Sequence, residues 1–159
     1  LGELVKQDFI EQGIWNDAYD GEKKEWFLST LDLIRDRFHT IRDFATLGRA
    51  YFADDYAVEA KPLKKNILKH PDLKTWLPML SQRFAGLDDF TKESSEATAR
   101  ELAAELDIKP GILINGMRTV LTGQLAGPGM FDILIALGKE RVVQRLHNIS
   151  HLYRESSEK

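Results

Sequence analysis

Apolar residues recur at intervals of three and four positions along almost the whole chain, and no stretch alternates apolar and polar residues as a half-buried strand does. This periodicity predicts helices over residues 2–12, 22–38, 40–52, 64–70, 71–85, 92–107, 112–122, 131–137 and 139–153. The connections between them are short, and helices with short connections pack as neighbours. The pattern therefore predicts an all-α fold, a helical bundle.

Residues that begin and end helices stand where this pattern needs them. Thr40 and Asp43 are three residues apart and match a capping box with a shorter acid than usual, and Thr91 is a good N-cap. Gly13 and Gly123 each follow an apolar-periodic segment, a position where glycine commonly ends a helix. These signals support the helix assignments independently of the periodicity.

A loop over residues 86–90 separates the predicted helices into two groups. We expect a two-lobed bundle, with residues 1–87 as an N-terminal helical lobe and residues 88–159 as a C-terminal helical lobe. The chain has 159 residues and a mass of 18.2 kDa, which is ample for a hydrophobic core.

Composition narrows the class of protein. Hydrophobic residues make up 43% of the chain and charged residues 30%, as in soluble globular proteins. The chain has no cysteine, so disulfides, thiolate nucleophiles and cysteine-ligated metal sites are excluded. The longest apolar run, residues 133–137, is far shorter than the roughly 20 residues of a membrane span. We therefore expect no membrane partner.

The charge distribution is uneven. The net charge is −3, but residues 1–108 carry 15 basic and 21 acidic residues, whereas residues 109–159 carry 7 basic and 4 acidic residues. A basic C-terminal third is a weak indication of binding to a polyanion. Ordinary fluctuation in composition explains the same counts.

Motifs for catalysis are missing. Gly127 and Gly129 lack the third glycine of a dinucleotide-binding loop and follow a predicted helix instead of a strand. His147 and His151 have metal-ligand spacing, but no acidic third ligand lies one turn away, so solvated histidines are the simpler interpretation. We expect no catalytic residue, no metal site and no bound cofactor in this chain.

Residues 108–146 carry a more specific pattern. It consists of Arg118, Thr122-Gly123, Pro128-Gly129, Phe131 and Gly138-Lys139-Glu140-Arg141. At this spacing the segment strongly resembles the C-terminal anticodon-binding region of bacterial glutamyl-tRNA synthetases, class I aminoacyl-tRNA synthetases. Met117, Val120 and Met130 depart from the family pattern by apolar swaps of similar bulk. Weaker matches over residues 36–44, 52–56 and 61–70 extend the resemblance to about residues 1–150.

The resemblance implies a helix-cage fold that recognises a tRNA anticodon. It implies selection of glutamate tRNA, with glutamine tRNA left open, for ATP-dependent aminoacylation in the cytoplasm. Both class I catalytic signatures are absent, so we expect this chain to be a non-catalytic, monomeric part of a ligase. Its partners would be tRNA and a catalytic domain in the same polypeptide, where ATP and magnesium would act.

Residue roles follow only from matching family positions. Arg118 matches the arginine that reads the first anticodon base, and Arg37 a position implicated in reading the third base. An arginine fork suits this task because it binds base acceptors bidentately. The resemblance assigns backbone contacts to the neighbouring bases to Gly127, Pro128, Gly129 and Met130. Lys139 and Arg141 are expected near phosphates, with a solvated helix surface as the alternative.

Other functions remain open at this point. A helical docking module for another protein would explain the acidic N-terminal part without RNA. The anticodon domain of a related class I synthetase would share most of the pattern. An enzyme built on His147 and His151 is the third possibility.

Overall fold

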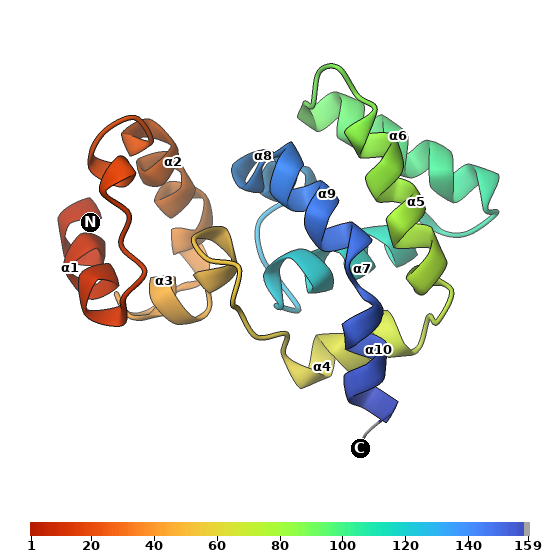
Figure 1. Ribbon diagram of the computed structural model, residues 1–159, viewed down its shortest axis with the longest axis horizontal. Helices are drawn as coiled ribbons and strands as arrows, with labels where there is room; N and C mark the ends of the chain where they lie inside the picture. The colour runs from red at the N-terminus through yellow and green to blue at the C-terminus, as the bar shows by residue number, and fades with distance from the viewer. Residues whose placement is uncertain (158–159) are drawn as a thin grey trace. The chain divides into compact units, whose positions relative to one another are not determined.

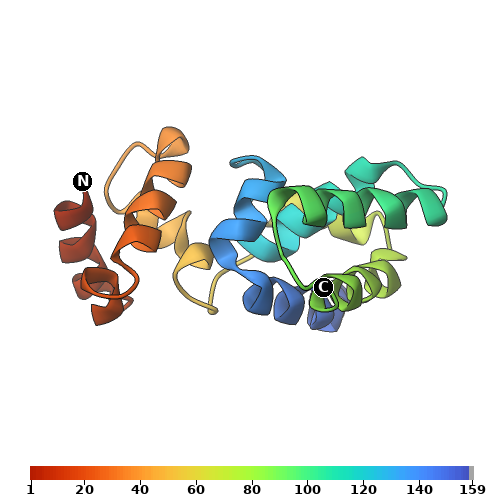
Figure 2. The same ribbon diagram turned by 90° about the horizontal axis from the view of Figure 1, so that it is seen from above.

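The computed structural model describes residues 1–157, and every regular element in that range is helical (Figures 1 and 2). The predicted all-α fold is confirmed. The α-helices are α1 (Gly2–Gln12), α2 (Lys24–Ile34), α3 (Asp43–Thr46), α4 (Ala60–Pro62), α5 (Leu73–Ala85), α6 (Lys92–Glu105), α7 (Pro110–Thr122), α8 (Met130–Leu137), α9 (Lys139–His147) and α10 (Ser150–Ser157). Three 3-10 helices and one π-helix complete the described elements. The 3-10 helices are η1 (Asp17–Asp20), η2 (Arg35–Arg37) and η3 (Arg49–Tyr51), and the π-helix is η4 (Leu63–Leu68).

The chain forms two compact units, and their boundary differs from the expected one. The first unit is Leu1–Tyr56, and the second begins at Ala57. The expected division between residues 87 and 88 falls inside the second unit, because α5 packs extensively against α9 and also against α6 and α7. Figure 1 shows α5 and α9 side by side. The loop at residues 86–90 therefore connects helices of one core.

Aromatic side chains build the core of the first unit. Phe9, Phe27 and Phe52 are all buried, with edge-on ring contacts between each pair of them. Tyr19 stacks on Phe27, with 4.9 Å between the ring centroids and 6° between the ring planes. Offset and edge-on aromatic pairs contribute stability beyond their buried area. The rings thus join α1, η1, α2 and the end of η3.

Two predicted helices of the first unit are shorter than expected. The helix expected over residues 22–38 ends as α2 at Ile34 and continues only as the single turn η2. The helix expected over residues 40–52 is divided into α3 and η3 around Gly48. A Cβ on Gly48 would lie 2.8 Å from the Phe44 carbonyl oxygen, so this turn requires glycine. The tight packing around Gly48 explains the division.

Hydrogen bonds form at both predicted capping positions, although α3 begins only at Asp43, with Arg42 and not Thr40 as its N-cap. Asp43 N donates to Thr40 Oγ1 at 3.2 Å, and Thr40 N donates to Asp43 Oδ2 at 3.0 Å, which is the reciprocal pattern of a capping box. Thr91 caps α6 in the same reciprocal way, with Ser94 as its partner. Both motifs are local in sequence, where the Thr40–Asp43 pair and the Thr91 N-cap were predicted and the part played by Ser94 was not.

The second unit is built around α7. Its Leu113, Met117 and Leu121 are fully buried, as are Leu73 and Leu77 of α5. The long helix expected over residues 139–153 is instead α9 and α10, separated at Asn148, whose φ of −101° and ψ of 65° are not helical. In Figure 1, α10 crosses η4, and it contacts that element. Elements far apart in sequence thus enclose α7.

Candidate nucleic-acid interface

Arg118 contacts the glycine-rich loop that precedes α8. The residue lies on α7, one turn before this helix ends, and its side chain is half-buried. Its Nη1 donates a hydrogen bond of 2.7 Å to the carbonyl oxygen of Pro128. Charged donors form the stronger protein hydrogen bonds. The structure therefore brings Arg118 together with the loop whose backbone the resemblance assigned to the same site.

The two glycines of this loop make room for polar side chains. A Cβ on Gly127 would lie 3.2 Å from Arg118 Nη1, and a Cβ on Gly129 would lie 3.0 Å from Asp132 Oδ2. Both distances are tighter than ordinary contacts, so a larger residue would displace one of these side chains or the loop itself. The glycines thus let the backbone approach Arg118 on one side and Asp132 on the other.

Asp132 and Lys92 fix the beginning of α8, and neither was predicted as part of the site. Asp132 stands in the first turn of α8, where a carboxylate favours the positive end of the helix dipole. Lys92 Nζ lies 2.8 Å from Asp132 Oδ1, and the hydrogen bond with Asp132 raises the pKa of Lys92. A carboxylate three residues after Gly129 was the available sequence signal, but its partner on α6 lies 40 positions away.

Met130, which the resemblance placed in contact with a base, is buried in the structure. It is the first residue of α8, and the residue as a whole is only 4% exposed. Its side chain packs into the core of the second unit. The whole residue, backbone included, therefore offers little surface for the contact with a base that the resemblance implied.

The end of α7 is held by hydrogen bonds from two directions. Thr122 Oγ1 donates to the Arg118 carbonyl oxygen at 2.7 Å and accepts from Gln124 N at 3.1 Å. Arg145 on α9 donates from Nη1 to the Leu121 carbonyl oxygen at 3.0 Å. Gly123 then ends the helix with a φ of 74°. These contacts make the helix end that carries Arg118 a rigid support.

Arg37 belongs to the first unit and is held quite differently. It is the last residue of η2, it is exposed, and its guanidinium makes no hydrogen bond or ion pair with residues 1–153. The turn that follows is ordered by Asp43, whose Oδ2 accepts from His39 N at 2.8 Å and from Thr40 N at 3.0 Å. These backbone hydrogen bonds hold the pKa of Asp43 below its usual range.

The remaining predicted contacts lie on α9. Lys139 is half-buried, and its Nζ donates a hydrogen bond of 2.5 Å to the Leu87 carbonyl oxygen, so it ties α9 to the loop after α5. Arg141 is half-buried as well. His147 and His151 are exposed, and the described part of the chain contains no group of three His, Cys, Asp or Glu side chains that could hold a metal ion. Within the same part, no helix has the length and apolar character needed to cross a membrane.

Comparison with known proteins gives one family for nearly the whole chain. The model of the family described as "Anticodon binding domain" matches residues 2–150. A glutamate–tRNA ligase of Desulfotalea psychrophila is 60% identical over 153 residues, which are 96% of this chain and 31% of that protein. A second glutamate–tRNA ligase, from Koribacter versatilis, is 38% identical over 94% of this chain and 30% of its own length.

A solved structure shares the fold. The crystal structure of a glutamate tRNA ligase from Elizabethkingia meningosepticum aligns with a TM-score of 0.71 and 21% identity, over 91% of this chain and 28% of that one. At this identity the likeness concerns the fold alone. The chain spans about 31% of the length of the Desulfotalea relative, so the similarity covers one part of a longer protein.

Proposed function

Because the chain belongs to the anticodon-binding domain family, we propose that it is the anticodon-reading part of a glutamate–tRNA ligase and binds the anticodon loop of glutamate tRNA. The observation that carries the proposal is the hydrogen bond from Arg118 to Pro128, which seats a planar cation on a loop with two glycines. Anticodon bases are unstacked single-strand elements, and proteins recognise such bases by their edges. A fixed guanidinium beside an approachable backbone suits that task.

Arg118 reads the first anticodon base in this proposal. Its guanidinium has five N–H donors in one plane, and the bond to Pro128 fixes the orientation of that plane. A fork of fixed orientation discriminates bases because only some bases present acceptors at the matching positions. The backbone of residues 127–129 contacts the neighbouring bases, which Gly127 and Gly129 permit sterically.

Arg37 reads the third anticodon base, the position that separates glutamate from glutamine anticodons. Support comes from its exposure at the end of η2 and from the ordered turn at His39–Asp43 that follows it. Lys139 is assigned to the support of the loop after α5, because its ammonium is engaged with Leu87. Arg141 is assigned to the phosphates of the RNA.

Aminoacylation itself belongs to the remainder of such a ligase. In this proposal ATP and magnesium act in the catalytic domain, and the described residues offer no group of three His, Cys, Asp or Glu side chains that could hold a metal ion. The role of this chain is therefore selection of the tRNA. Glutamate transfer and ATP consumption take place in the catalytic domain of the same polypeptide, and the assembly acts as a monomer.

Binding of RNA stem-loops tests the proposal. The chain is titrated with the anticodon stem-loop of glutamate tRNA and with stem-loops in which each anticodon base is varied in turn, at several salt concentrations. We expect tighter binding of the matched anticodon and a linear decrease of log affinity with log salt, because phosphate contacts release counterions. Equal affinity for all anticodons would contradict the proposal. If the chain binds another protein and shows no affinity for any of the RNA stem-loops, the docking module is favoured instead.

A further inference from the structure

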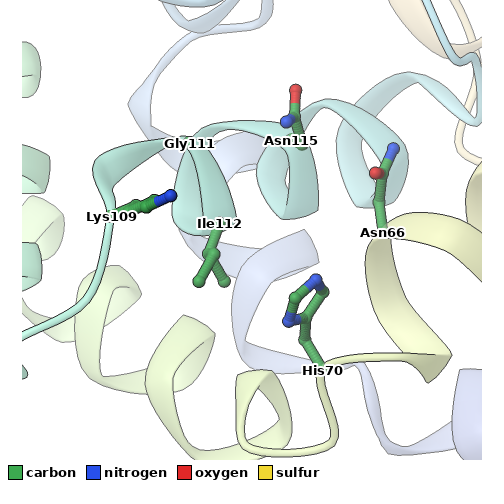
Figure 3. Close-up of a pocket in the computed structure, with 6 residues that line it drawn as sticks. All are labelled: Asn66, His70, Lys109, Gly111, Ile112 and Asn115. Atoms are coloured by element: carbon green, nitrogen blue, oxygen red, sulfur yellow. The ribbon is translucent and has the colours of Figure 1, made fainter.

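A cavity of about 240 Å³ lies between the first turns of α7 and the segment that joins η4 to α5 (Figure 3). It is lined by Asn66, His70, Lys109, Gly111, Ile112 and Asn115. Its volume is several times the ~30 Å³ that one water occupies and less than the roughly 300–1,000 Å³ of drug-sized ligand sites. The space therefore suits a group of the size of a single nucleobase.

The lining combines an aromatic ring, an apolar side chain, amides and a cation. In Figure 3 the imidazole of His70 points toward α7, and Ile112 projects from α7 into the same space. Lys109 extends its ammonium along the beginning of α7, whereas the amide of Asn115 points away from Ile112 and His70. None of the described residues that line the cavity carries a carboxylate. This composition favours a ligand that has a flat ring and carries negative charge.

The walls of the cavity are built into the core of the second unit. Asn66 is only 8% exposed, and its Nδ2 donates to Thr119 Oγ1 at 3.2 Å. The carbonyl oxygen of His70 accepts hydrogen bonds from Leu73 N at 3.0 Å and from Tyr153 Oη at 3.4 Å. The backbone of His70 is therefore held by α5 and α10. These hydrogen bonds fix the position from which the imidazole ring extends.

The cavity also lies along the helix face that carries Arg118. Gly111, Asn115 and Arg118 follow one another on α7 at intervals of four and three residues, and residues so spaced share a face of a helix. Arg118 is about 4.5 Å further along the helix axis than Asn115, at roughly 1.5 Å per residue. An RNA loop that reaches Arg118 would thus extend along α7 toward the cavity.

We propose that this cavity binds one unstacked nucleotide of the RNA loop, in addition to the bases read by Arg118 and Arg37. The base stacks on His70, with Ile112 against its other face, and proteins commonly hold splayed RNA bases on aromatic rings in this way. Lys109 contacts the phosphate. The inference rests on the proposed function, since it assigns a further subsite to the same RNA.

A base-deletion series tests the subsite. Each nucleotide of the stem-loop is replaced in turn by an abasic one, and affinity is measured for the wild type, His70→Ala and the matched control His147→Ala, which removes an exposed histidine of α9. In the wild type we expect one abasic position, other than the first and third anticodon positions, to weaken binding at least about 5-fold, as loss of one stacked base does. The same abasic substitution should leave the affinity of His70→Ala unchanged. It should weaken binding to His147→Ala by the same factor as in the wild type.

A second variant keeps the test decisive if His70→Ala loses its fold. His70→Phe retains a ring for stacking, so the penalty at the same abasic position should persist in it. Equal penalties at every position in the wild type and in a folded His70→Ala, or loss of the penalty in His70→Phe, would overturn the subsite. If base selectivity at the anticodon remains in either case, the proposed function stands alone. If no stem-loop binds the wild type, both fail.

Discussion

Arg37 and Arg118 are assigned to the same kind of task, yet the two units hold them in different ways. Arg118 stands on a 13-residue helix with a fully buried face, and its guanidinium is bound to the backbone of a loop. Arg37 ends a single turn of helix and is exposed. Under the proposed function, Arg118 would be oriented before RNA binds, whereas Arg37 would be ordered by the RNA itself.

The largest expected effect concerns how the two units end their helices. Gly13 and Gly123 both have a φ of 74°, but a Cβ on Gly123 would lie 2.2 Å from the Ala57 carbonyl oxygen, whereas nothing lies within 4 Å of one on Gly13. Gly123→Ala should lower the free energy of unfolding by about 3 kcal/mol or more, because steric overlap adds to backbone strain. Gly13→Ala should cost only about 1–2 kcal/mol from the left-handed backbone. Urea denaturation measures both, and equal costs would contradict the close packing at Gly123.

The second prediction compares the stability contributions of the arginines. Arg118→Ala should lower the free energy of unfolding by about 1–2 kcal/mol, because it removes a charged hydrogen bond to the Pro128 carbonyl oxygen. Arg37→Ala should change it by less than about 0.5 kcal/mol, as substitutions at exposed positions usually do. Thermal unfolding of the two variants measures the difference. A larger loss for Arg37→Ala would reverse the comparison.

At a third helix end, the end of α6, we expect a smaller effect, and there the substitution should raise the free energy of unfolding. Asp107 follows α6 with a φ of 55°, the one positive φ among described residues other than glycine, and the hydrogen bonds Asp107 N to Ala104 O and Ile108 N to Ala103 O form a Schellman motif. Asp107→Gly should raise the free energy of unfolding by up to about 1 kcal/mol, because glycine adopts this backbone without strain. A destabilised Asp107→Gly in urea denaturation would show that the aspartate side chain outweighs its backbone strain.

The smallest effect is expected at the Asp43 cap, and it depends on pH. The pKa of Asp43 is lowered in the folded state, chiefly by the backbone hydrogen bonds from His39 and Thr40. A lowered pKa stabilises the fold above the ordinary carboxyl range, and that stabilisation is lost as the pH falls through the folded-state value. Asp43→Ala should therefore be less stable than the wild type at pH 7, and the difference should shrink on acidification. If the difference in stability between the wild type and Asp43→Ala stays constant from pH 7 to pH 2, the ionised carboxylate of Asp43 does not stabilise the fold.

The parts of this fold that were predictable from sequence are the local ones. The predicted hydrogen bonds between Thr40 and Asp43 form, and Thr91 is the N-cap of α6 as predicted, although its pairing with Ser94 was not foreseen. The division of the helix expected over residues 40–52 was missed, since it depends on the contacts that enclose Gly48. The unit boundary was missed for the same reason, because α5 packs on a helix more than 50 residues later.

The candidate site shows the same limit. Family-like spacing identified Arg118 and residues 127–130, but periodicity could not show that Arg118 binds the Pro128 carbonyl oxygen or that Met130 is buried. The Lys92–Asp132 pair and the cavity beside His70 bring together residues that are far apart in the chain. Contacts of that kind carry no local signal in a single sequence.

The most direct measurement of the central claim is the anticodon selectivity of the wild type, Arg118→Ala and Arg37→Ala. A matched panel of stem-loops, varied at each anticodon position, is bound to all three proteins at one salt concentration, after helical content has been checked. A bidentate base contact typically contributes about 1–3 kcal/mol of discrimination. We expect Arg118→Ala to lose preference mainly at the first position and Arg37→Ala mainly at the third. A uniform loss across the panel would show phosphate contacts only, and unchanged selectivity in both variants would contradict the account of how this chain reads RNA.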